Sequence, residues 1–232
     1  MRTSEIRQSV DNFGIARTAC DLALRAINRL VFFKILRGVV IEKADPRFLV
    51  CDDRYRFSRL EERTLRKFAA SQDYELSDGF LRDAFARGDE CYGFLDDVVL
   101  AAYGWYTRRP TSLDRPELVL HFSDRYIYMY KGFTHSAHRG QRLHAIGMTK
   151  ALAIFLARGY RGLISYVEAT NFSSRRSCYR MGYADFGTVA ILGLGARGLA
   201  RGSAGCLPYD FRVEWSQPAG QTSSLPSAGT VA

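Results

Sequence analysis

Residues 126–157, with the sequence YIYMYKGFTHSAHRGQRLHAIGMTKALAIFLA, decide the fold of this protein. The segment 126–134 alternates aromatic and other residues and predicts a strand, whereas apolar residues over 143–157 recur at helical spacing. The basic connection 139–142 therefore leads from a strand directly into a helix start, where free N–H groups and a partial positive charge bind phosphate. An ordinary loop with solvated arginines is the alternative, and these residues alone leave the two interpretations equal.

The flanking segments predict two helices, then antiparallel strands, then a strand–helix–strand unit. A serine–glutamate capping box at 58–61 predicts one helix start, and the signals at 77–88 predict a complete second helix. A glycine-rich bend is expected over 193–205, because no helix period follows its G-x-G-x-x-G string. The other expected strands cover residues 55–57, 90–95, 98–107, 117–122, 163–168, 183–192 and 209–215, and the last expected helix covers 171–181.

The first 40 residues have a different pattern. Apolar residues over 12–40 are spaced three and four apart and predict a helix. We therefore expect an amphipathic helical extension over 1–45, an α/β domain over 50–215 and a disordered tail over 216–232. Charges interrupt the apolar part of the extension too often for a membrane span. A basic amphipathic helix suits an anionic membrane surface or an acidic carrier protein, and packing on its own domain is the alternative.

The charge balance narrows the functional class. The chain has 232 residues and a formal net charge of +9, from 33 basic and 24 acidic residues. Only five basic residues are lysines, and the arginines are spread along the chain instead of gathering in one segment. This spread argues against a dedicated nucleic-acid binder, although a basic protein still suits a ligand that carries phosphates or carboxylates.

Cysteines and histidines point away from disulfides and metals. The five cysteines form an odd set without a C-x-x-C pair, so we expect a reduced, cytoplasmic protein. His135, His138 and His144 lie close in sequence with no thiol or carboxylate among them, so we expect no metal site. The polar segment 1–11 does not have the form of a secretory signal.

Two segments resemble the GNAT superfamily, the Gcn5-related N-acetyltransferases, in their order and separation. Residues 134–143 resemble that family's pyrophosphate-binding turn, whose pattern is Gln or Arg, two residues, Gly, one residue, then Gly or Ala. Arg139 matches the opening position, whereas Arg142 and His144 stand at the two small-residue positions. Residues 171–183 resemble the family's Asn-x-x-Ala/Ser segment that ends in Gly-Phe or Gly-Tyr.

The resemblance implies an α/β fold with a mixed, mostly antiparallel sheet flanked by helices, which splays open between the strands ending at Thr134 and Glu168. Acyl-coenzyme A would lie in the gap, with Asn171 and Ser174 beside its pantetheine arm. Arg142 fits the glycine position only if its backbone does not need a positive φ. Backbone groups of Lys131, Gly132, Phe133 and Thr134 would pair with the arm, and amide N–H groups of Arg139, Gly140, Gln141, Arg142, Leu143 and His144 would hold the pyrophosphate.

The resemblance also implies a set of catalytic residues. A backbone N–H near Phe133 would polarise the thioester carbonyl. The family's tyrosine acid falls on Cys178, one position before Tyr179. Tyr179 is the acid if the helix starts one residue out of register, and Cys178 or water serves otherwise. Glu168, at the strand end, and His135, beside the gap, are the two candidates for the base.

Aromatic residues on neighbouring strands are candidates for the acceptor pocket. Tyr128 and Tyr130 share one strand face, and Trp105 and Tyr103 share a face of another strand. They line a flat, hydroxyl-rich pocket for the acceptor, or they form a core face under a helix.

These features together predict an N-acetyltransferase that moves an acetyl group from acetyl-CoA to a primary amine of a small molecule, by direct attack in a ternary complex. One alternative is a longer-chain N-acyltransferase that uses acyl-CoA or an acyl-carrier protein at a membrane surface. The other is a non-catalytic, CoA-binding scaffold. The expected partners are the small amine, no nucleic acid, a second copy of the chain in a homodimer and, through the extension, the inner face of the membrane.

Overall fold

The computed structural model describes residues 10–12, 14–19, 22, 31–113, 115–194 and 197–215. Its strands are β1 (Phe32–Ile41), β2 (Tyr55–Leu60), β3 (Glu90–Asp96), β4 (Val99–Thr107), β5 (Thr111–Ser112), β6 (Leu118–His121), β7 (Tyr126–Thr134), β8 (Gly162–Glu168), β9 (Ala184–Leu194), β10 (Arg197–Gly202) and β11 (Arg212–Trp215). Its α-helices are α3 (Glu62–Ala69), α4 (Asp78–Arg87), α5 (Leu143–Ala157) and α6 (Phe172–Arg180). Short 3-10 turns cover Pro46–Phe48, Gln72–Tyr74, Ser136–His138 and Ala204–Tyr209.

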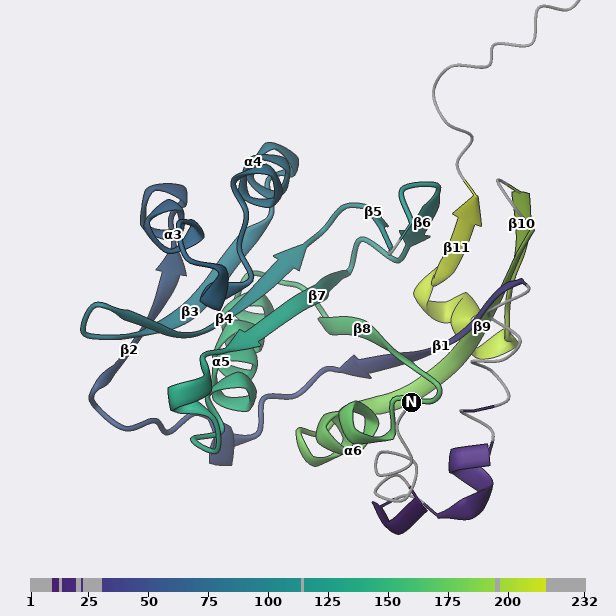
Figure 1. Cartoon of the computed structure of the whole chain (residues 1–232), viewed down its shortest axis with the longest axis horizontal. Helices are drawn as coiled ribbons and strands as arrows, with labels where there is room; N and C mark the ends of the chain where they lie inside the picture. The colour runs from purple at the N-terminus through teal and green to yellow at the C-terminus, as the bar shows by residue number, and fades with distance from the viewer. Residues whose placement is uncertain are drawn as a thin grey trace, which may run out of the picture.

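The strands form one large sheet and one small sheet (Figure 1). The large sheet has the order β10-β9-β1-β8-β7-β4-β3-β2, and the small one has the order β11-β6-β5. In the large sheet β7 and β8 are parallel, and every other neighbouring pair is antiparallel. The expected fold class, a mixed and mostly antiparallel sheet flanked by helices, is confirmed.

The parallel pair β7–β8 separates soon after it begins. The two strands are in register only at Tyr126–Gly162, Ile127–Leu163 and Tyr128–Ile164. Beyond this point β7 continues along β4, while β8 continues along β1 as far as the pair Leu36–Glu168. The gap between residues 129–134 of β7 and 165–168 of β8 is called the wedge below. The expected splay between these two strands is therefore confirmed.

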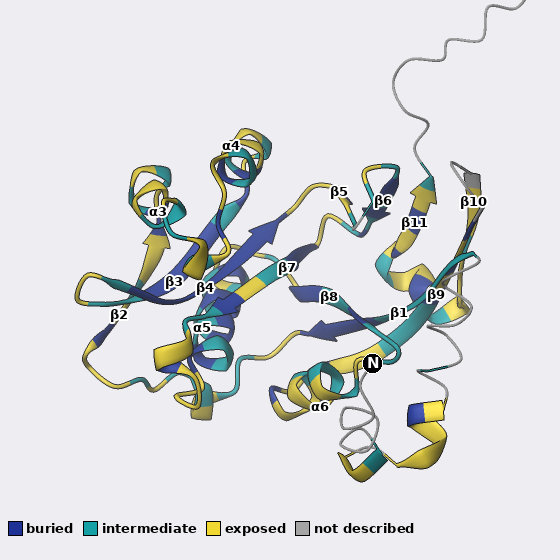
Figure 2. Cartoon of the chain, viewed as in Figure 1, coloured by how far each residue is buried: buried dark blue, intermediate teal, exposed yellow. Residues whose placement is uncertain are grey.

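Helices and the small sheet cover the two faces of the large sheet. On one face α5 packs on β4, β7 and β8 through a cluster that includes Met148, Leu152 and Phe155. On the other face α3 and α4 cover the β2–β4 end, and the small sheet with the turn Ala204–Tyr209 covers the β1–β9 end. Figure 2 shows the resulting buried strands between more exposed helices.

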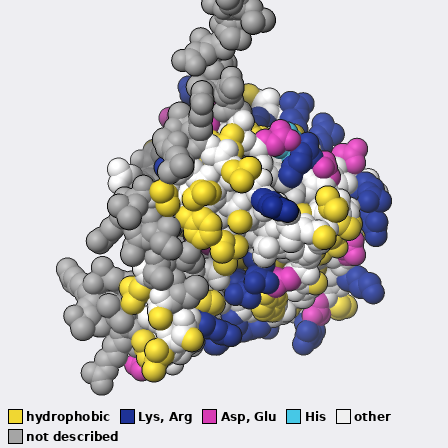
Figure 3. Space-filling model, turned by 90° about the vertical axis from the view of Figure 1, so that its right-hand side faces the viewer, with side chains coloured by type: hydrophobic (Ala, Val, Ile, Leu, Met, Phe, Trp, Pro, Cys, Tyr) yellow, Lys and Arg dark blue, Asp and Glu magenta, His cyan; other side chains and the backbone are white. Residues whose placement is uncertain are grey.

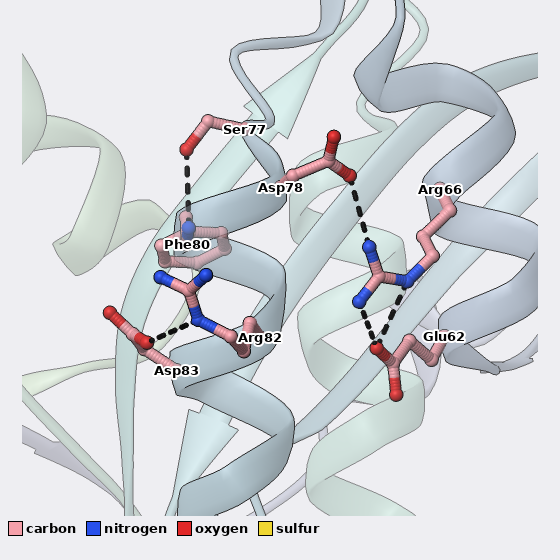
Figure 4. Close-up of polar contacts among 7 residues, drawn as sticks. All are labelled: Glu62, Arg66, Ser77, Asp78, Phe80, Arg82 and Asp83. Carbon is pink, nitrogen blue, oxygen red and sulfur yellow. Dashed lines mark hydrogen bonds and ion pairs between the residues drawn. The ribbon is translucent and has the colours of Figure 1, made fainter.

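Polar contacts fix the starts of α3 and α4 (Figure 4). The Ser77 hydroxyl accepts a hydrogen bond from the Phe80 N–H at 3.2 Å, so it caps α4 as its sequence predicts. Arg66 of α3 donates to Glu62 at 2.6 Å in its own helix and to Asp78 of α4 at 3.1 Å. These bonds tie the two helices together over the sheet.

The prediction of a continuous helix over 12–40 is wrong for its second half. Residues 10–12 and 15–19 are helical, but Phe32–Ile41 forms β1 between β8 and β9. A strand buried on both faces loses its alternating pattern and reads as a continuous apolar run, which periodicity cannot separate from a helix. The α/β domain therefore begins at Phe32 and not at residue 50. The rest of the extension, 1–9 and 23–30, and the tail 216–232 lie outside the described residues.

Two smaller expectations are also wrong. Ser58 lies inside β2, paired with Gly93 of β3, and α3 begins only after Glu61. Pairing with β3 therefore overrides the capping-box signal. The glycine-rich segment belongs to a hairpin, as expected, but the bend does not extend over 193–205, because residues 197–202 form β10 and pair with β9. A Cβ on Gly198 would collide with the ring of Trp215, so close packing explains that glycine.

The exposed surface carries mixed charges. On the face shown in Figure 3, arginine and lysine side chains are interspersed with aspartate and glutamate. No helix within the described ranges is long and apolar enough to cross a membrane. The described residues also contain no group of three His, Cys, Asp or Glu side chains placed to hold a metal ion.

Candidate active site

The wedge exposes the backbone of one strand edge. Past Tyr128, β7 has β4 on one side and no strand on the other, so alternate N–H and C=O groups face the gap. The register with β4 shifts here, because Trp105 pairs with Lys131 and Tyr106 with Met129. This bulge leaves Tyr130 without a cross-strand partner and bends the strand. At the apex of the wedge the Ser165 hydroxyl donates to the Met129 carbonyl at 2.8 Å.

The four predicted arm-binding residues lie along this edge. Gly132 is the one exposed residue of β7, coloured yellow in Figure 2. Phe133 is buried, and its ring stacks on Tyr103 with centroids 5.1 Å apart. The half-buried Lys131 places its ammonium 3.8 Å from the Glu75 carboxylate. Thr134, which is also half-buried, ends the strand. The edge therefore combines anchored side chains with an accessible backbone at its centre.

Free amides lie at the mouth of the wedge, where β7 passes into α5. The first helical bond of α5 runs from the Ile146 N–H to the Arg142 carbonyl, and no side chain caps the helix. The N–H groups of Leu143, His144 and Ala145 thus make no hydrogen bond with any described residue. Arg139, Gly140, Gln141 and Arg142 are all exposed around this turn, and within the described chain neither arginine forms an ion pair. The turn and the amides together form an electropositive site for an anion.

Arg142 has a positive φ of 57°, in the left-handed region. Arginine fits the glycine position of the motif only if the backbone at residue 142 does not need a positive φ, and this condition is not met. A side chain in this conformation costs about 1–2 kcal/mol. Gly140, two positions earlier, also has a positive φ of 83°, which glycine adopts freely.

The His144 side chain borders the wedge, whereas the sequence predicted a role only for the backbone N–H of this residue. A Cβ on Gly132 would lie 2.5 Å from His144 Cε1 and 2.9 Å from Met129 Cε, so the ring rests against the glycine backbone. Burial lowers the pKa of the imidazole, which favours the neutral form. His144 also lines a narrow cavity between α5 and β4, together with Tyr106. Burial raises the pKa of Tyr106, so its hydroxyl stays protonated.

Asn171 and Ser174 meet at the start of α6. The Asn171 side-chain oxygen accepts hydrogen bonds from the Ser174 N–H at 3.1 Å and from the Ser173 hydroxyl at 3.0 Å. Asn171 therefore caps α6, as asparagine commonly does. The cap fixes the exposed amide group of Asn171 near the end of β8.

The two candidate acids point in different directions from α6. The Tyr179 hydroxyl donates to the Asp185 carboxylate at 2.8 Å and accepts from Arg175 at 3.2 Å. Asp185 lies on β9 and is also bound by Arg37 of β1 at 2.8 Å. Cys178 packs toward the core under α5, and burial raises the pKa of its thiol. The Tyr179 hydroxyl is thus held by a residue of β9, which β1 separates from β8 in the sheet.

The two candidate bases lie on opposite sides of the wedge. The Glu168 carboxylate, at the end of β8, accepts a hydrogen bond from the Lys34 ammonium of β1 at 2.5 Å. His135, just past β7, accepts from the Ala137 N–H through Nδ1 at 3.3 Å, and its ring lies 5.5 Å from that of Tyr74. The structure does not bring these two residues together.

The predicted acceptor residues lie on the face that α3, α4 and the small sheet cover. Trp105 is fully buried against Phe80 and packs as a core residue. Tyr128 is also buried, and its ring stacks on Tyr166 with centroids 6.3 Å apart. The side chain of Tyr130, at the bulge, enters a polar cluster.

Tyr130 joins a buried carboxylate that sequence patterns did not single out. Its hydroxyl donates to Asp89 Oδ2 at 2.9 Å, and Arg87 donates to the same oxygen at 2.7 Å. Asp89 is buried, and its Oδ1 has no hydrogen-bond partner among the described residues. Asp89 directly follows Gly88, the glycine that ends α4, and no motif in the sequence marks it as a site residue. Only the strand order places it beside Tyr130.

Comparisons with known proteins find relatives by structure and not by sequence. No family model matches the chain, and no curated protein matches its sequence. The structure is similar to an acetyltransferase of the GNAT family from Novosphingobium aromaticivorans, with 18% identity and a TM-score of 0.45, over 81% of this chain and 67% of that one.

Two other solved structures are similar at the same level. One is a GNAT-family acetyltransferase from Colwellia psychrerythraea, with 13% identity and a TM-score of 0.48, over 69% of this chain and 56% of that one. The other is a GCN5-related N-acetyltransferase from Sphaerobacter thermophilus, with 11% identity and a TM-score of 0.49, over 73% of this chain and 54% of that one. This chain thus spans little more than half the length of these two proteins.

Proposed function

We propose that this protein is an acyltransferase of the GNAT type, which transfers an acetyl group from acetyl-CoA to a primary amine of a small molecule. The observation that carries the proposal is the wedge, with uncapped amides of α5 at its mouth. A parallel strand pair that separates within three residues leaves an edge able to bind an extended, amide-containing ligand. A helix start without a cap supplies the adjacent site for a phosphate group.

The residues present fit an acyl-CoA ligand. The N–H groups of Leu143, His144 and Ala145 would bind pyrophosphate oxygens, with Arg139 and Arg142 adding positive charge. The open edge of β7 would hydrogen-bond the amides of the pantetheine arm. Gly132 supports this fit, because it is exposed and has no side chain, so the β7 backbone is accessible there; a Cβ would meet the His144 ring.

The chemistry needs a polarised carbonyl and two proton transfers. Acetyl-CoA, when bound, supplies a thioester whose carbonyl carbon accepts the amine nitrogen while the carbon–sulfur bond breaks. A β7 backbone N–H near Phe133 would stabilise negative charge on the carbonyl oxygen. Glu168 or His135 would take the proton from the amine, and Tyr179, Cys178 or water would return one to the thiolate. Tyr179 donates to Asp185 and Glu168 accepts from Lys34, so each side chain would have to exchange this partner to act in the reaction.

Binding and turnover test the proposal separately. Acetyl-CoA is titrated calorimetrically into the full chain, and an amine panel is then screened by detecting free CoA thiol. Replacing Arg139 with Gln should weaken binding about tenfold, the value of one charge-assisted hydrogen bond. Arg56→Gln, an exposed arginine on the edge strand β2, is the matched control and should leave binding unchanged. No binding of acetyl-CoA or any longer acyl-CoA would refute the proposal.

A second candidate function is a scaffold that binds CoA without catalysis. It is favoured by the engagement of Tyr179 with Asp185, away from the wedge. Tight acetyl-CoA binding with no thiol release from any amine would support it. Palmitoyl-CoA in the same titration separates the acetyl donor from a longer-chain donor. We also propose that the protein is cytoplasmic and forms a homodimer. Residues 1–45 would contact a membrane or a carrier protein.

A further inference from the structure

The outward side of α6 lines a cavity whose arginines have no role in the proposed reaction. Phe172, Arg175, Arg176 and Tyr179 recur at the spacing of one helix face. Arg17, from the amino-terminal segment, lies opposite them, and the five residues line a cavity of about 250 Å³. The inward side of the same helix packs on the core through Cys178. The cavity therefore lies on the side of α6 that faces away from α5.

The charge of this cavity is unbalanced. Three of its five lining residues are arginines and none is acidic. Arg17 and Arg176 form no ion pair or hydrogen bond with any described residue. Arg175 donates to the Ala169 carbonyl at 3.3 Å and to the Tyr179 hydroxyl at 3.2 Å, and its Nε is buried without a partner in the described part of the chain. Three guanidinium groups around one space repel one another, so an anion between them lowers the energy.

Aromatic rings hold two of the guanidinium groups in place. The Cζ atoms of Arg17 and Arg175 lie 5.4 Å and 5.9 Å from the centroid of Phe172. Arg175 Cζ also lies 5.9 Å from the centroid of Tyr179. A guanidinium that stacks by its face keeps the N–H groups of its edge available to donate. The rings thus order the arginines before a ligand binds, which reduces the entropy lost on binding.

We propose that this cavity binds the phosphate group of a small phosphorylated molecule. A phosphate monoester carries a charge of about −1.5 to −2 and three terminal oxygens, so it can accept from several guanidinium groups at once. A carboxylate, with a single charge and two oxygens, satisfies fewer of them. The volume of 250 Å³ suits a compact ligand and not a polymer.

The experiment titrates inorganic phosphate calorimetrically into the full chain at low ionic strength. Arg139→Gln serves as the background, so that binding at the start of α5 does not obscure the result. Adding Arg17→Gln or Arg176→Gln should weaken phosphate binding about tenfold, from the loss of one charge-assisted hydrogen bond. Arg180→Gln is the matched control, because Arg180 is exposed on the same helix outside the cavity, and it should change affinity less than twofold.

The source of the phosphate is distinguished by comparing CoA with dephospho-CoA. If the site takes the ribose phosphate of CoA, Arg176→Gln weakens CoA about tenfold and leaves dephospho-CoA unchanged. If it takes a separate molecule, both cofactors bind the variant normally while inorganic phosphate binds about tenfold more weakly. If Arg176→Gln and Arg180→Gln change the affinity for every ligand by the same factor, the proposal that this cavity binds phosphate is overturned. Because the phosphate titration needs no acetyl transfer, its failure is separable from failure of the proposed function.

Discussion

Replacing Gly132 with alanine tests the close approach of His144 to the wedge. The added Cβ would lie 2.5 Å from His144 Cε1 and 2.9 Å from His144 Nδ1. Carbon atoms pack best at about 3.5–4.0 Å, so the first contact is about 1 Å too short. Overpacking of this kind costs about 1–3 kcal/mol of unfolding free energy. For a chain of this size each kcal/mol lowers Tm by about 2–4 °C.

The assay is urea unfolding of four proteins: wild type, Gly132→Ala, His144→Ala and the double variant. With the imidazole removed, two of the three nearest contacts of the alanine disappear and the third is the flexible end of Met129, so its cost should fall below about 0.5 kcal/mol. Gly79→Ala is the control, because a Cβ there meets only Arg82 Nη2 at 3.8 Å. This control lies in α4 and should stabilise the protein by about 0.5–1 kcal/mol. An equal cost of Gly132→Ala with and without His144 would refute the contact.

Three further predictions concern local features. Arg142→Gly should change the unfolding free energy by between zero and about +1.5 kcal/mol. The glycine removes the strain of the left-handed backbone, and this gain equals or exceeds the cost of the greater entropy that glycine gives the unfolded chain. A loss of stability above about 1 kcal/mol in thermal unfolding would contradict this prediction. Burial lowers the pKa of His144, so the unfolded state binds the proton more tightly, and stability should fall as pH decreases below about 6.5. His144→Gln should reduce this dependence in urea titrations from pH 7.5 to 5, and an unchanged slope would count against it. Ser77→Ala should cost about 1 kcal/mol through loss of the α4 cap, whereas the exposed Ser173→Ala should cost less, and thermal unfolding compares them.

Sequence patterns were sufficient where a segment ends in a specific turn or cap. The hairpin of β3 and β4, the capped helix α4 and the strand–turn–helix unit of β7 and α5 all follow from short-range signals. Ser77, Gly88 and the aspartates 96–97 act within a few residues of their own backbone. The paired motifs at 134–143 and 171–183 follow β7 and β8, the two strands that form the wedge.

Long-range contacts decided the rest. Strand β1 lies between β8 and β9. Leu36 and Val40 pack in the core on one face and Val39 and Ile41 in the core on the other, so its apolar residues do not alternate and their period does not indicate a strand. The β2–β3 pairing similarly overrode the local helix signal at Ser58.

By itself, the sequence determined the strand–helix turn, the basic character of that turn and the order of most elements, because these depend on neighbours along the chain. Only the tertiary structure decided how the turn can act. It ended the β7–β8 pairing after Tyr128, set His144 against Gly132 and brought Arg17 to the arginines of α6. Each of these contacts joins residues distant in sequence, and their distances depend on how the sheet packs and not on any local pattern.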